Sequence, residues 1–519
     1  MKILRAAFCA ALSLATWLTP ACADDVTLMS RDGAVEISGT LLGFDGEFYR
    51  VDTPYGILTV DGSAVRCDGP GCPNLGQYVA EFTLSGAREM GAVLMPALVE
   101  GFALSNGYAV ARQDLPEAEM LYTLLENDGE TVAARITIRL STSSEGFADL
   151  VAEQTDMVMS LREVSQSERA MTRDAGLGDF SRLRQTRVVA LDALVPIVAP
   201  VNPVSRISVE QLAAIYAGRI STWDGMGGEA APVTLHLRDS DAGFGHIFVR
   251  SVMNAMGEKL SENTLHHSTN GGVTAAVAED PFGIGIASFA RHGFGEVLRL
   301  SGQCGFEIAA TQETIKAGDY PLTAPMYLYL PERRLPVLAR DLIRFLQTEQ
   351  AQRIISRIGL VNQSLATIPL DHQGARITNA IRAAGPEIDL AELQRMMALF
   401  GEKERLSLTF RFQGGSTQLD GPSKSNIVLL AEALEAGRFD GKTITFVGFS
   451  DGQGQASLNR ALSKRRADTV RREVVKAALA FDADRVAIAT DGFGEALPMA
   501  CDDSAWGRRI NRRVEVWID

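Results

Sequence analysis

Residues 442–467 read KTITFVGFSDGQGQASLNRALSKRRA and carry the change of pattern that decides the fold of the last part of the chain. The apolar and β-branched run over 442–447 predicts a strand. The glycines that follow predict a loop, and the apolar spacing over 457–479 predicts a helix. A strand, a loop and a helix in this order are typical of a mixed α/β fold.

The same alternation continues on both sides of this stretch. We expect further strands over 407–412, 485–490 and 513–518 and a helix over 425–435. Residues 401–519 are therefore predicted to form one α+β domain. Residues 371–400, rich in Arg, Ala and Glu, are predicted to form a charged helical connector before it.

Gly448-Phe-Ser-Asp-Gly452 matches the G-x-S-x-G nucleophile elbow of hydrolases. Such hydrolases need a histidine base that follows the serine along the chain. The last histidine of this sequence is His372, upstream of Ser450. The sequence also has no Walker loop, dinucleotide motif or His/Cys metal spacing. We therefore expect no enzyme activity, no cofactor and no metal site.

Asp451 and Arg466 are fifteen residues apart, one in the loop after the strand and the other in the following helix. An aspartate accepts hydrogen bonds from an ammonium group, and an arginine binds a carboxylate with two parallel bonds. Together they suit an amino-acid zwitterion. On spacing alone, two solvated charges are the simpler interpretation.

The wider pattern resembles the OmpA-like peptidoglycan-binding domain. The matching residues are Ser450-Asp451, Asn459, Leu462-Ser463-Lys-Arg-Arg466-Ala467, Gly492-Phe-Gly-Glu495, Pro498 and Gly507-Arg508-Arg-Ile-Asn511-Arg512-Arg513-Val514-Glu515. The resemblance implies that Asp451 and Arg466 hold the diaminopimelate of the peptidoglycan stem peptide, and that Asn459 and Arg512 line or brace the same pocket. The family's usual His-Thr before the aspartate is Phe449-Ser450 here, which keeps the hydroxyl and alters the pocket rim.

Residues 76–370 also alternate strands and helices, which predicts an α/β domain with mainly parallel strands. The expected strands cover 82–85, 135–140 and 157–160, and the expected helices cover 90–104, 146–153 and 209–217. Ser85-Gly86-Ala87 and Ser141-Thr-Ser-Ser-Glu-Gly146 each precede a predicted helix. Helix N-termini bind anions, but small hydroxyl residues there are also ordinary helix caps, and capping is the simpler interpretation.

This middle part resembles the phosphate-binding protein of ABC transporters, the PstS-like class of periplasmic receptors. The matching residues are Thr83-Leu-Ser-Gly86, Asp156-Met-Val-Met-Ser160-Leu-Arg162-Glu163, Asn202-Pro203, Ile215-Tyr-Ala-Gly218-Arg-Ile-Ser-Thr-Trp223, Gly227-Gly228, Arg238-Asp239, Phe282-Gly-Ile-Gly285 and Gly318-Asp-Tyr-Pro321-Leu322. The resemblance implies a two-lobed periplasmic-binding-protein fold of type II that closes on its ligand like a hinge.

The family's phosphate contacts carry over to one set of residues: Ser85, Gly86, Ala87, Arg88, Ser143, Ser144, Ser160, Arg162, Arg238 and Gly243. The family's Ser-Gly-Thr loop is Ala242-Gly243-Phe244 here, so two hydroxyl donors are missing. Because hydrogen bonds to charged groups contribute about 1.5–3 kcal/mol each, the loss of these two donors is expected to weaken phosphate binding. Arg88 either supplies compensating charge or is an exposed arginine at a helix start.

Residues 1–23 are predicted to be a secretory signal, with a basic start, an apolar run and Ala21-Cys22-Ala23 as the cleavage site. A membrane helix is the alternative, but this run of thirteen residues, which includes Ser13 and Thr16, falls short of the roughly 20 apolar residues that a bilayer needs. Lipidation at Cys22 is disfavoured because Thr19-Pro20 before it lacks the branched apolar residue that lipid-attachment signals usually carry at the third position back. After the signal, residues 24–75 show hairpin patterns and predict a small β-domain.

Four cysteines remain after the signal, in an oxidising compartment. Cys67-Asp-Gly-Pro-Gly-Cys72 is a tight turn, so Cys67 and Cys72 are expected to form a disulfide. Cys304 and Cys501 are left unassigned.

The formal net charge of the 519-residue chain is -14, which disfavours a nucleic-acid partner. Its composition, 46% hydrophobic and 22% charged, is that of an ordinary globular protein. We expect a periplasmic solute-binding protein for phosphate or a related oxyanion, tethered to peptidoglycan, with the outer membrane as a candidate neighbour and an ABC transporter permease as a candidate partner. The alternative is an envelope structural or signalling protein whose PstS-like domain recruits another ligand or a protein.

Overall fold

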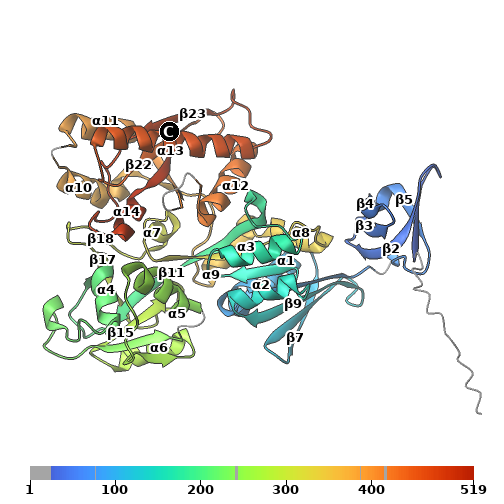
Figure 1. Cartoon of the computed structure of the whole chain (residues 1–519), viewed down its shortest axis with the longest axis horizontal. Helices are drawn as coiled ribbons and strands as arrows, with labels where there is room; N and C mark the ends of the chain where they lie inside the picture. Colours follow the sequence, from blue (N-terminus) through green and yellow to red (C-terminus); the bar gives the residue numbers. More distant parts are fainter. Residues whose placement is uncertain (1–24, 76–77, 240–242, 386, 414–417) are drawn as a thin grey trace, which may run out of the picture. The chain divides into compact units, whose positions relative to one another are not determined.

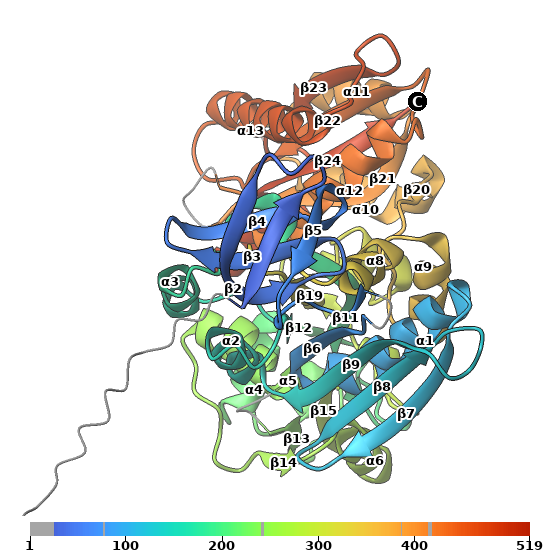
Figure 2. The ribbon, with the colours of Figure 1, turned by 90° about the vertical axis from the view of Figure 1, so that its right-hand side faces the viewer.

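Figures 1 and 2 show the computed structural model of the chain, which describes residues 25–75, 78–239, 243–385, 387–413 and 418–519. The chain divides into two compact units, one ending at Ala80 and the other running from Glu81 to Asp519. The predicted signal peptide, residues 1–23, lies outside the described residues, as does Ala242 of the predicted anion loop. Within the described ranges, no helix is both long and apolar enough to cross a membrane.

The first unit is a five-stranded antiparallel sheet in the order β4-β3-β2-β1-β5, which Figure 2 shows face on. Its strands are β1 (Val26–Ser30), β2 (Glu36–Phe44), β3 (Phe48–Thr53), β4 (Gly56–Asp61) and β5 (Val65–Asp68). Alternate residues point to one face of a strand, and Val26 and Leu28 of β1 are accordingly buried together. A disulfide joins Cys67 and Cys72, the two cysteines of the tight turn.

The middle domain, which begins with β6, contains a large mixed sheet in the order β14-β13-β15-β11-β19-β10-β6-β9-β8-β7, with β16 beside β11. Its strands are β6 (Ala80–Ala87), β7 (Ala109–Leu115), β8 (Glu119–Leu125), β9 (Val132–Ser141), β10 (Met157–Ser160), β11 (Thr186–Val198), β13 (Thr234–Arg238), β14 (Leu265–His267), β15 (Gly283–Ser288), β16 (Glu296–Val297) and β19 (Thr323–Tyr329). A three-stranded sheet adds β12 (Arg206–Ser208), β17 (Arg299–Ser301) and β18 (Glu307–Ile308).

The expectation of mainly parallel strands is wrong for much of this sheet. The neighbours β7, β8 and β9 pair antiparallel, and β11 pairs antiparallel with both β15 and β19. Parallel pairs join β6 to β10 and β13 to β14 and β15. The β7–β8 connection is too short for the crossover that a parallel pair requires, so these strands form a hairpin.

The sheet is organised as two lobes (Figure 1). They are joined by β11 and β19, which pair antiparallel from Thr186 and Tyr329 to Ala193 and Thr323. The first lobe holds β6–β10 with α1 (Met95–Ser105), α2 (Ser143–Val151), α3 (Gln166–Asp174), α8 (Val337–Phe345) and α9 (Glu349–Arg357). A π-helical turn, Met90–Leu94, precedes α1. The second lobe holds β13–β15 with α4 (Val209–Tyr216), α5 (Gly243–Phe248), α6 (Asn270–Glu279) and α7 (Gln312–Lys316).

The C-terminal domain is built on a five-stranded sheet in the order β20-β21-β24-β22-β23. Its strands are β20 (Thr367–Ile368), β21 (Glu404–Arg411), β22 (Thr443–Phe449), β23 (Ala487–Gly492) and β24 (Arg513–Ile518). Its helices are α10 (Gly374–Ala383), α11 (Leu390–Phe400), α12 (Gly421–Glu435), α13 (Ala456–Ala477) and α14 (Ala505–Asn511).

Both faces of this sheet are covered, because the side chains of β22 alternate between two cores. Ile444 and Phe446 pack with α12 and α13, whereas Phe449 packs with α10 and α11. Phe400 of α11 stacks on Trp517 of β24 with ring centroids 3.8 Å apart. The helices predicted to be a connector over 371–400 are therefore part of the core of the C-terminal domain.

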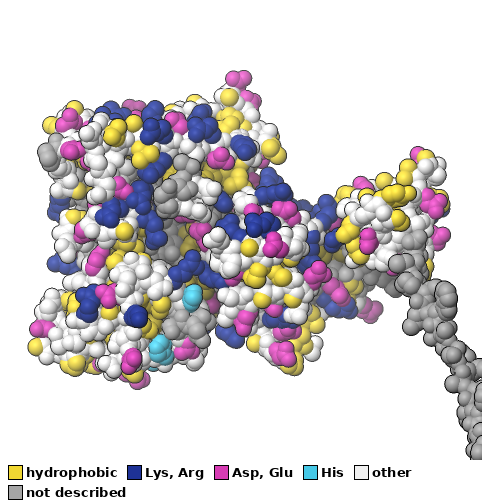
Figure 3. All heavy atoms as spheres, in the orientation of Figure 1, with side chains coloured by type: hydrophobic (Ala, Val, Ile, Leu, Met, Phe, Trp, Pro, Cys, Tyr) yellow, Lys and Arg dark blue, Asp and Glu magenta, His cyan; other side chains and the backbone are white. Residues whose placement is uncertain are grey.

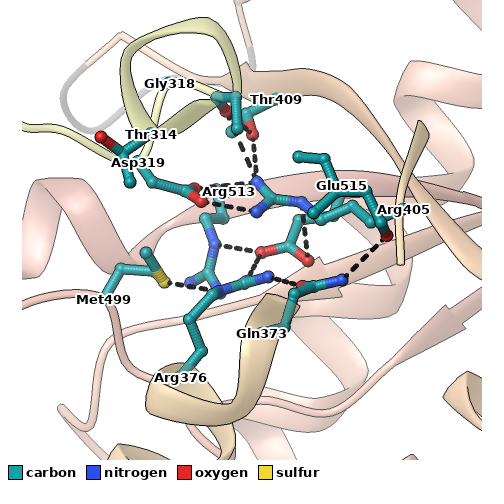
Figure 4. Close-up of polar contacts among 12 residues, drawn as sticks. Thr314, Gly318, Asp319, Gln373, Arg376, Arg405, Thr409, Met499, Arg513 and Glu515 are labelled. Atoms are coloured by element: carbon teal, nitrogen blue, oxygen red, sulfur yellow. Dashed lines mark hydrogen bonds and ion pairs between the residues drawn. The ribbon is translucent and has the colours of Figure 1, made fainter. Parts of the chain in front are cut away.

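Buried charges join the C-terminal domain to the second lobe (Figure 4). Arg405 of β21 donates two hydrogen bonds to Asp319, which precedes β19, with N···O distances of 2.6 and 2.8 Å. Nε of Arg405 lies 3.3 Å from Oε2 of Glu515, in β24. Glu515 also pairs with Arg376 and Arg513. A disulfide between Cys304 and Cys501, the two unassigned cysteines, adds a covalent link.

The C-terminal domain also contacts the first lobe and the strand that leaves it. Glu163 accepts a hydrogen bond from the backbone N–H of Gly421 at 3.1 Å. Ser425 of α12 accepts one from the N–H of Val188, in β11, at 3.0 Å. The C-terminal domain is thus bonded to both lobes of the middle domain.

Candidate functional site

The first candidate site lies where β22 ends and α13 begins, in the C-terminal domain. Gly448 allows this strand to cross α13 closely, because a Cβ atom there would lie 1.9 Å from the carbonyl oxygen of Ser463. The strand then delivers Ser450 and Asp451 to the start of the helix, which carries Asn459 and Arg466. The predicted pocket residues therefore come together at one edge of the sheet.

Asp451 is 8% exposed and is paired with Arg512 rather than with Arg466. Its Oδ2 accepts a hydrogen bond from Nη1 of Arg512, and its Oδ1 accepts one from the N–H of Gln453 at 3.3 Å. Arg512 follows directly after α14, the short helix that the sequence pattern did not predict. Arg512 therefore holds the carboxylate of Asp451 directly.

Arg466 offers an unused donor to this pocket. Among the described residues, its half-buried side chain has no hydrogen-bond partner for Nη1. Burial lowers the pKa of Arg466, as does the positive charge of Arg512, while Asp451 acts in the opposite direction. The guanidinium lies over the ring of Phe412, 5.7 Å from its centroid. A bound carboxylate would offset the cost of burying this charge.

Three carboxyl groups, those of Asp451, Glu495 and Asp502, lie close together near the start of α13. Asn459 is buried and donates from Nδ2 to Glu495 at 2.8 Å. Asp502 accepts from the N–H of Gly452 at 2.6 Å, and burial raises the pKa of both Glu495 and Asp502. Both carboxyl groups interact electrostatically with Asp451, which also interacts with Arg466, so an acidic cluster lies beside this arginine. Glu495 and Asp502 were missed as site residues, although Glu495 belongs to a motif quoted above.

The second candidate site lies in the cleft between the two lobes of the middle domain. A cavity of about 40 Å³ brings together four predicted residues, Ser143, Ser144, Arg162 and Gly243, along with His246 of α5. Nη2 of Arg162 donates to Oγ of Ser144 at 2.8 Å. The capping box of α2 is formed by Thr142 and Glu145, next to these serines.

The other predicted residues divide into buried and cleft-facing groups. Ser85 and Ser160 are fully buried and donate within the protein, to Asp149 and to the carbonyl of Arg162. Gly86 has a φ of +132° and no room for a Cβ atom, which would lie 2.1 Å from the carbonyl oxygen of Met159. A larger cavity of about 550 Å³ is lined by Ala87, Arg88, Arg238 and Gly243, together with Ser143.

The arginines of this cleft are paired with carboxylates. Arg162 makes two hydrogen bonds to Glu168, at 2.6 and 2.8 Å. Arg238, from the second lobe, is paired with Glu89, from the first. Glu89 was not predicted, since its partner is far away in the sequence. These pairs leave the cleft with less free positive charge than the sequence suggests.

Comparisons with known proteins match two parts of the chain. Residues 121–350 match the PBP superfamily domain, and residues 411–512 match the OmpA family. Phosphate-binding protein PstS of Bacillus subtilis is 28% identical over 166 residues, which are 31% of this chain and 53% of that protein. Outer membrane porin F of Pseudomonas aeruginosa is 31% identical over 118 residues, 23% of this chain and 32% of that protein.

Probable lipoprotein YiaD of Escherichia coli is 34% identical over 97 residues, 19% of this chain and 42% of that protein. The chain thus spans about half or less of the length of these three relatives. A crystal structure of an ABC-type phosphate transport receptor from Vibrio cholerae aligns with 54% of this chain and 99% of that chain, at 20% identity and a TM-score of 0.42. By the two family matches, the chain joins a PBP superfamily domain, whose relatives include phosphate-binding protein PstS, to a C-terminal domain of the OmpA family.

Proposed function

We propose that this chain is a peptidoglycan-attached binding protein, held by the diamino acid of the stem peptide at Asp451 and Arg466. One observation carries the proposal: the half-buried Arg466 has a donor without a partner among the described residues, beside the acidic cluster that includes Asp451 and Glu495. Diaminopimelate carries both carboxylate and ammonium groups. A pocket with an arginine beside an acidic cluster recognises that pattern of charges.

The proposed location is the periplasm. Two disulfides join the four cysteines that follow residue 23, and disulfides persist in oxidising compartments such as the periplasm. The predicted signal at residues 1–23 provides the export route. Relatives of the C-terminal domain named as outer membrane porin and lipoprotein support a place at the cell envelope.

The attachment is tested by sedimenting the exported chain with insoluble peptidoglycan that contains diaminopimelate. We expect Arg466→Ala and Asp451→Asn to leave most of the protein in the supernatant, since each removes one charge that faces the ligand. Arg465→Ala is the matched control, because Arg465 is the exposed neighbour of Arg466 on α13. Circular dichroism checks that the variants are folded. Equal sedimentation of all variants would refute the proposed role of this pocket.

For the middle domain we propose binding of phosphate or a related oxyanion between the lobes. The cavity of about 40 Å³ at Ser143, Ser144 and Arg162 supports this, because hydroxyls and a guanidinium suit a small anion. This function implies an ABC transporter permease as the partner that receives the ligand.

A second function is favoured by a different observation. The Arg162–Glu168 and Arg238–Glu89 pairs already neutralise two cleft arginines, and neither Gly243 nor Phe244 carries a hydroxyl. These features suit an envelope signalling or structural protein that recruits another ligand or a protein partner. Isothermal titration of phosphate, with sulfate as comparison, separates the two. Micromolar binding that Arg162→Ala abolishes would support the oxyanion function, and no heat at millimolar phosphate would support the second.

A further inference from the structure

A third cavity, of about 470 Å³, lies at the junction of the middle and C-terminal domains. The middle domain contributes Arg250 and Lys316, from the second lobe, and the C-terminal domain contributes Arg411, Phe412 and Arg509. We call it the junction cavity. It is separate from the cleft between the lobes and belongs to neither of the sites described above.

Among the residues that the structure describes, none of its four basic side chains forms a direct ion pair with a carboxylate, and Arg411 is only attracted electrostatically by Asp420. Nζ of Lys316 bonds to Asn362 and Ser364, at 2.6 and 2.9 Å, and burial lowers the pKa of Lys316 to about 8. Nη2 of Arg411 donates to the carbonyl of Gly318 at 2.7 Å, while its buried Nε has no partner. Buried cations with neutral partners remain poorly compensated, and an anion would stabilise them.

Two carboxylates also line the junction cavity, but both are engaged at the start of α12. Glu163 accepts from the N–H of Gly421 at 3.1 Å, and Asp420 accepts from the N–H of Ser423 at 3.0 Å. Helix N-termini favour negative charge. The four cations and two carboxylates leave a formal charge of about two positive units, by simple addition of side-chain charges. The junction cavity therefore suits an anionic ligand.

The junction cavity shares a wall with the proposed peptidoglycan pocket. Phe412 lines the cavity, and the guanidinium of Arg466 lies 5.7 Å from the centre of its ring. Helix α14 carries Arg509 at the cavity and leads directly to Arg512, the partner of Asp451. Figure 3 shows Lys and Arg side chains gathered over α14, beside a hollow between this domain and the lobes. Arg250 and Arg509 are exposed and so accessible to a ligand.

We propose that the junction cavity is an accessory anion site, which binds further carboxylates of the same stem peptide whose diamino acid lies at Arg466. This inference rests on the proposed function of the C-terminal domain. A peptide held at Arg466 can extend past Phe412 and place a carboxylate near Arg509 and Arg250. The middle domain then contributes directly to attachment to the cell wall.

The test compares two soluble probes by isothermal titration into the full exported chain: free diaminopimelate and a tetrapeptide that contains it and ends in a free carboxylate. The variant is Arg250→Glu combined with Arg509→Glu, which reverses two exposed charges. We expect tetrapeptide affinity to fall at least tenfold and diaminopimelate affinity to stay unchanged. Arg465→Glu is the matched control, since it reverses an exposed charge on α13 that does not line the cavity.

Equal tetrapeptide affinity in wild type and the double variant would overturn the accessory site while leaving the pocket at Arg466 intact. Failure of the wild type to bind either probe would instead refute the proposed function, and the accessory site with it. Inorganic phosphate is titrated as a third probe. Phosphate binding that the double variant loses, without any change for the tetrapeptide, would show that the cavity holds a free anion and would overturn the peptide assignment.

Discussion

The buried ion network between the domains predicts a large loss of stability in Asp319→Asn. Arg405 is 1% exposed, and its two hydrogen bonds to Asp319 are the charged contact that this substitution weakens. The network holds three arginines, Arg376, Arg405 and Arg513, and two carboxylates, Asp319 and Glu515. Replacing one carboxylate leaves a single negative charge among three buried positive ones.

The magnitude follows from this geometry. Removing one partner of a buried ion pair costs about 3–5 kcal/mol, since the remaining charge is left uncompensated. Asparagine keeps the shape of the side chain and can still accept one hydrogen bond, so we expect about 3 kcal/mol, at the lower end. Urea unfolding at pH 7, followed by circular dichroism, measures the difference.

The matched control is Asp440→Asn, which weakens an exposed pair with Arg485 whose N···O distance is 2.7 Å. Exposed pairs contribute about 0–1 kcal/mol, so this variant should resemble wild type. Burial raises the pKa of Asp319, but the nearby Arg405 and Arg376 outweigh it and hold this pKa below the ordinary 3.8. The stabilisation is therefore present above pH 3.8 and is lost as the pH falls below it. A loss in Asp319→Asn no larger than in the control would refute this reasoning.

Two further predictions use the same unfolding assay. Replacing Cys304 and Cys501 by serine should lower the free energy of unfolding more than replacing Cys67 and Cys72, because the bridged residues are 197 apart in the first pair and 5 in the second. The chain-entropy relation gives losses of about 5 and about 2 kcal/mol. Equal losses in the two variants would contradict this prediction. Burial and, to a smaller extent, the negative charge of Glu163 raise the pKa of Asp420 to about 6. Ionised Asp420 therefore destabilises the fold, and wild type should lose about 1–2 kcal/mol relative to Asp420→Asn between pH 4 and pH 7. A constant difference between the two proteins over that range would exclude this effect.

The local elements were predictable because their signals lie within a few residues. The strand expected over 157–160 is β10. The helix expected over 457–479 is α13, and the prediction starts one residue after α13 starts and ends two residues after α13 ends. The helix α14 was missed, since it has only seven residues and is held by distant contacts. Asn511, for example, accepts hydrogen bonds from the backbone of Met499 and Ala500.

The candidate sites were predictable only in part. The pairing of Asp451 with Arg512 and of Arg238 with Glu89 depends on how distant segments meet, which no local pattern encodes. The partners Cys304 and Cys501 lie in different domains, so spacing could not join them. The junction cavity exists only because two domains pack together, and its basic residues are scattered over four segments of the sequence.

The contacts of the C-terminal domain with both lobes have a mechanical consequence. Proteins of two lobes commonly work by rotation about the strands that join them. Here the C-terminal domain is bonded to the first lobe and its outgoing strand at Glu163 and Val188, and to the second lobe at Asp319 and Cys304. Rotation of one lobe must either move the C-terminal domain with it or break one of these two sets of bonds. Under the proposed attachment to peptidoglycan, tension on the C-terminal domain would be transmitted to the hinge, and movement at the hinge would be transmitted to the wall.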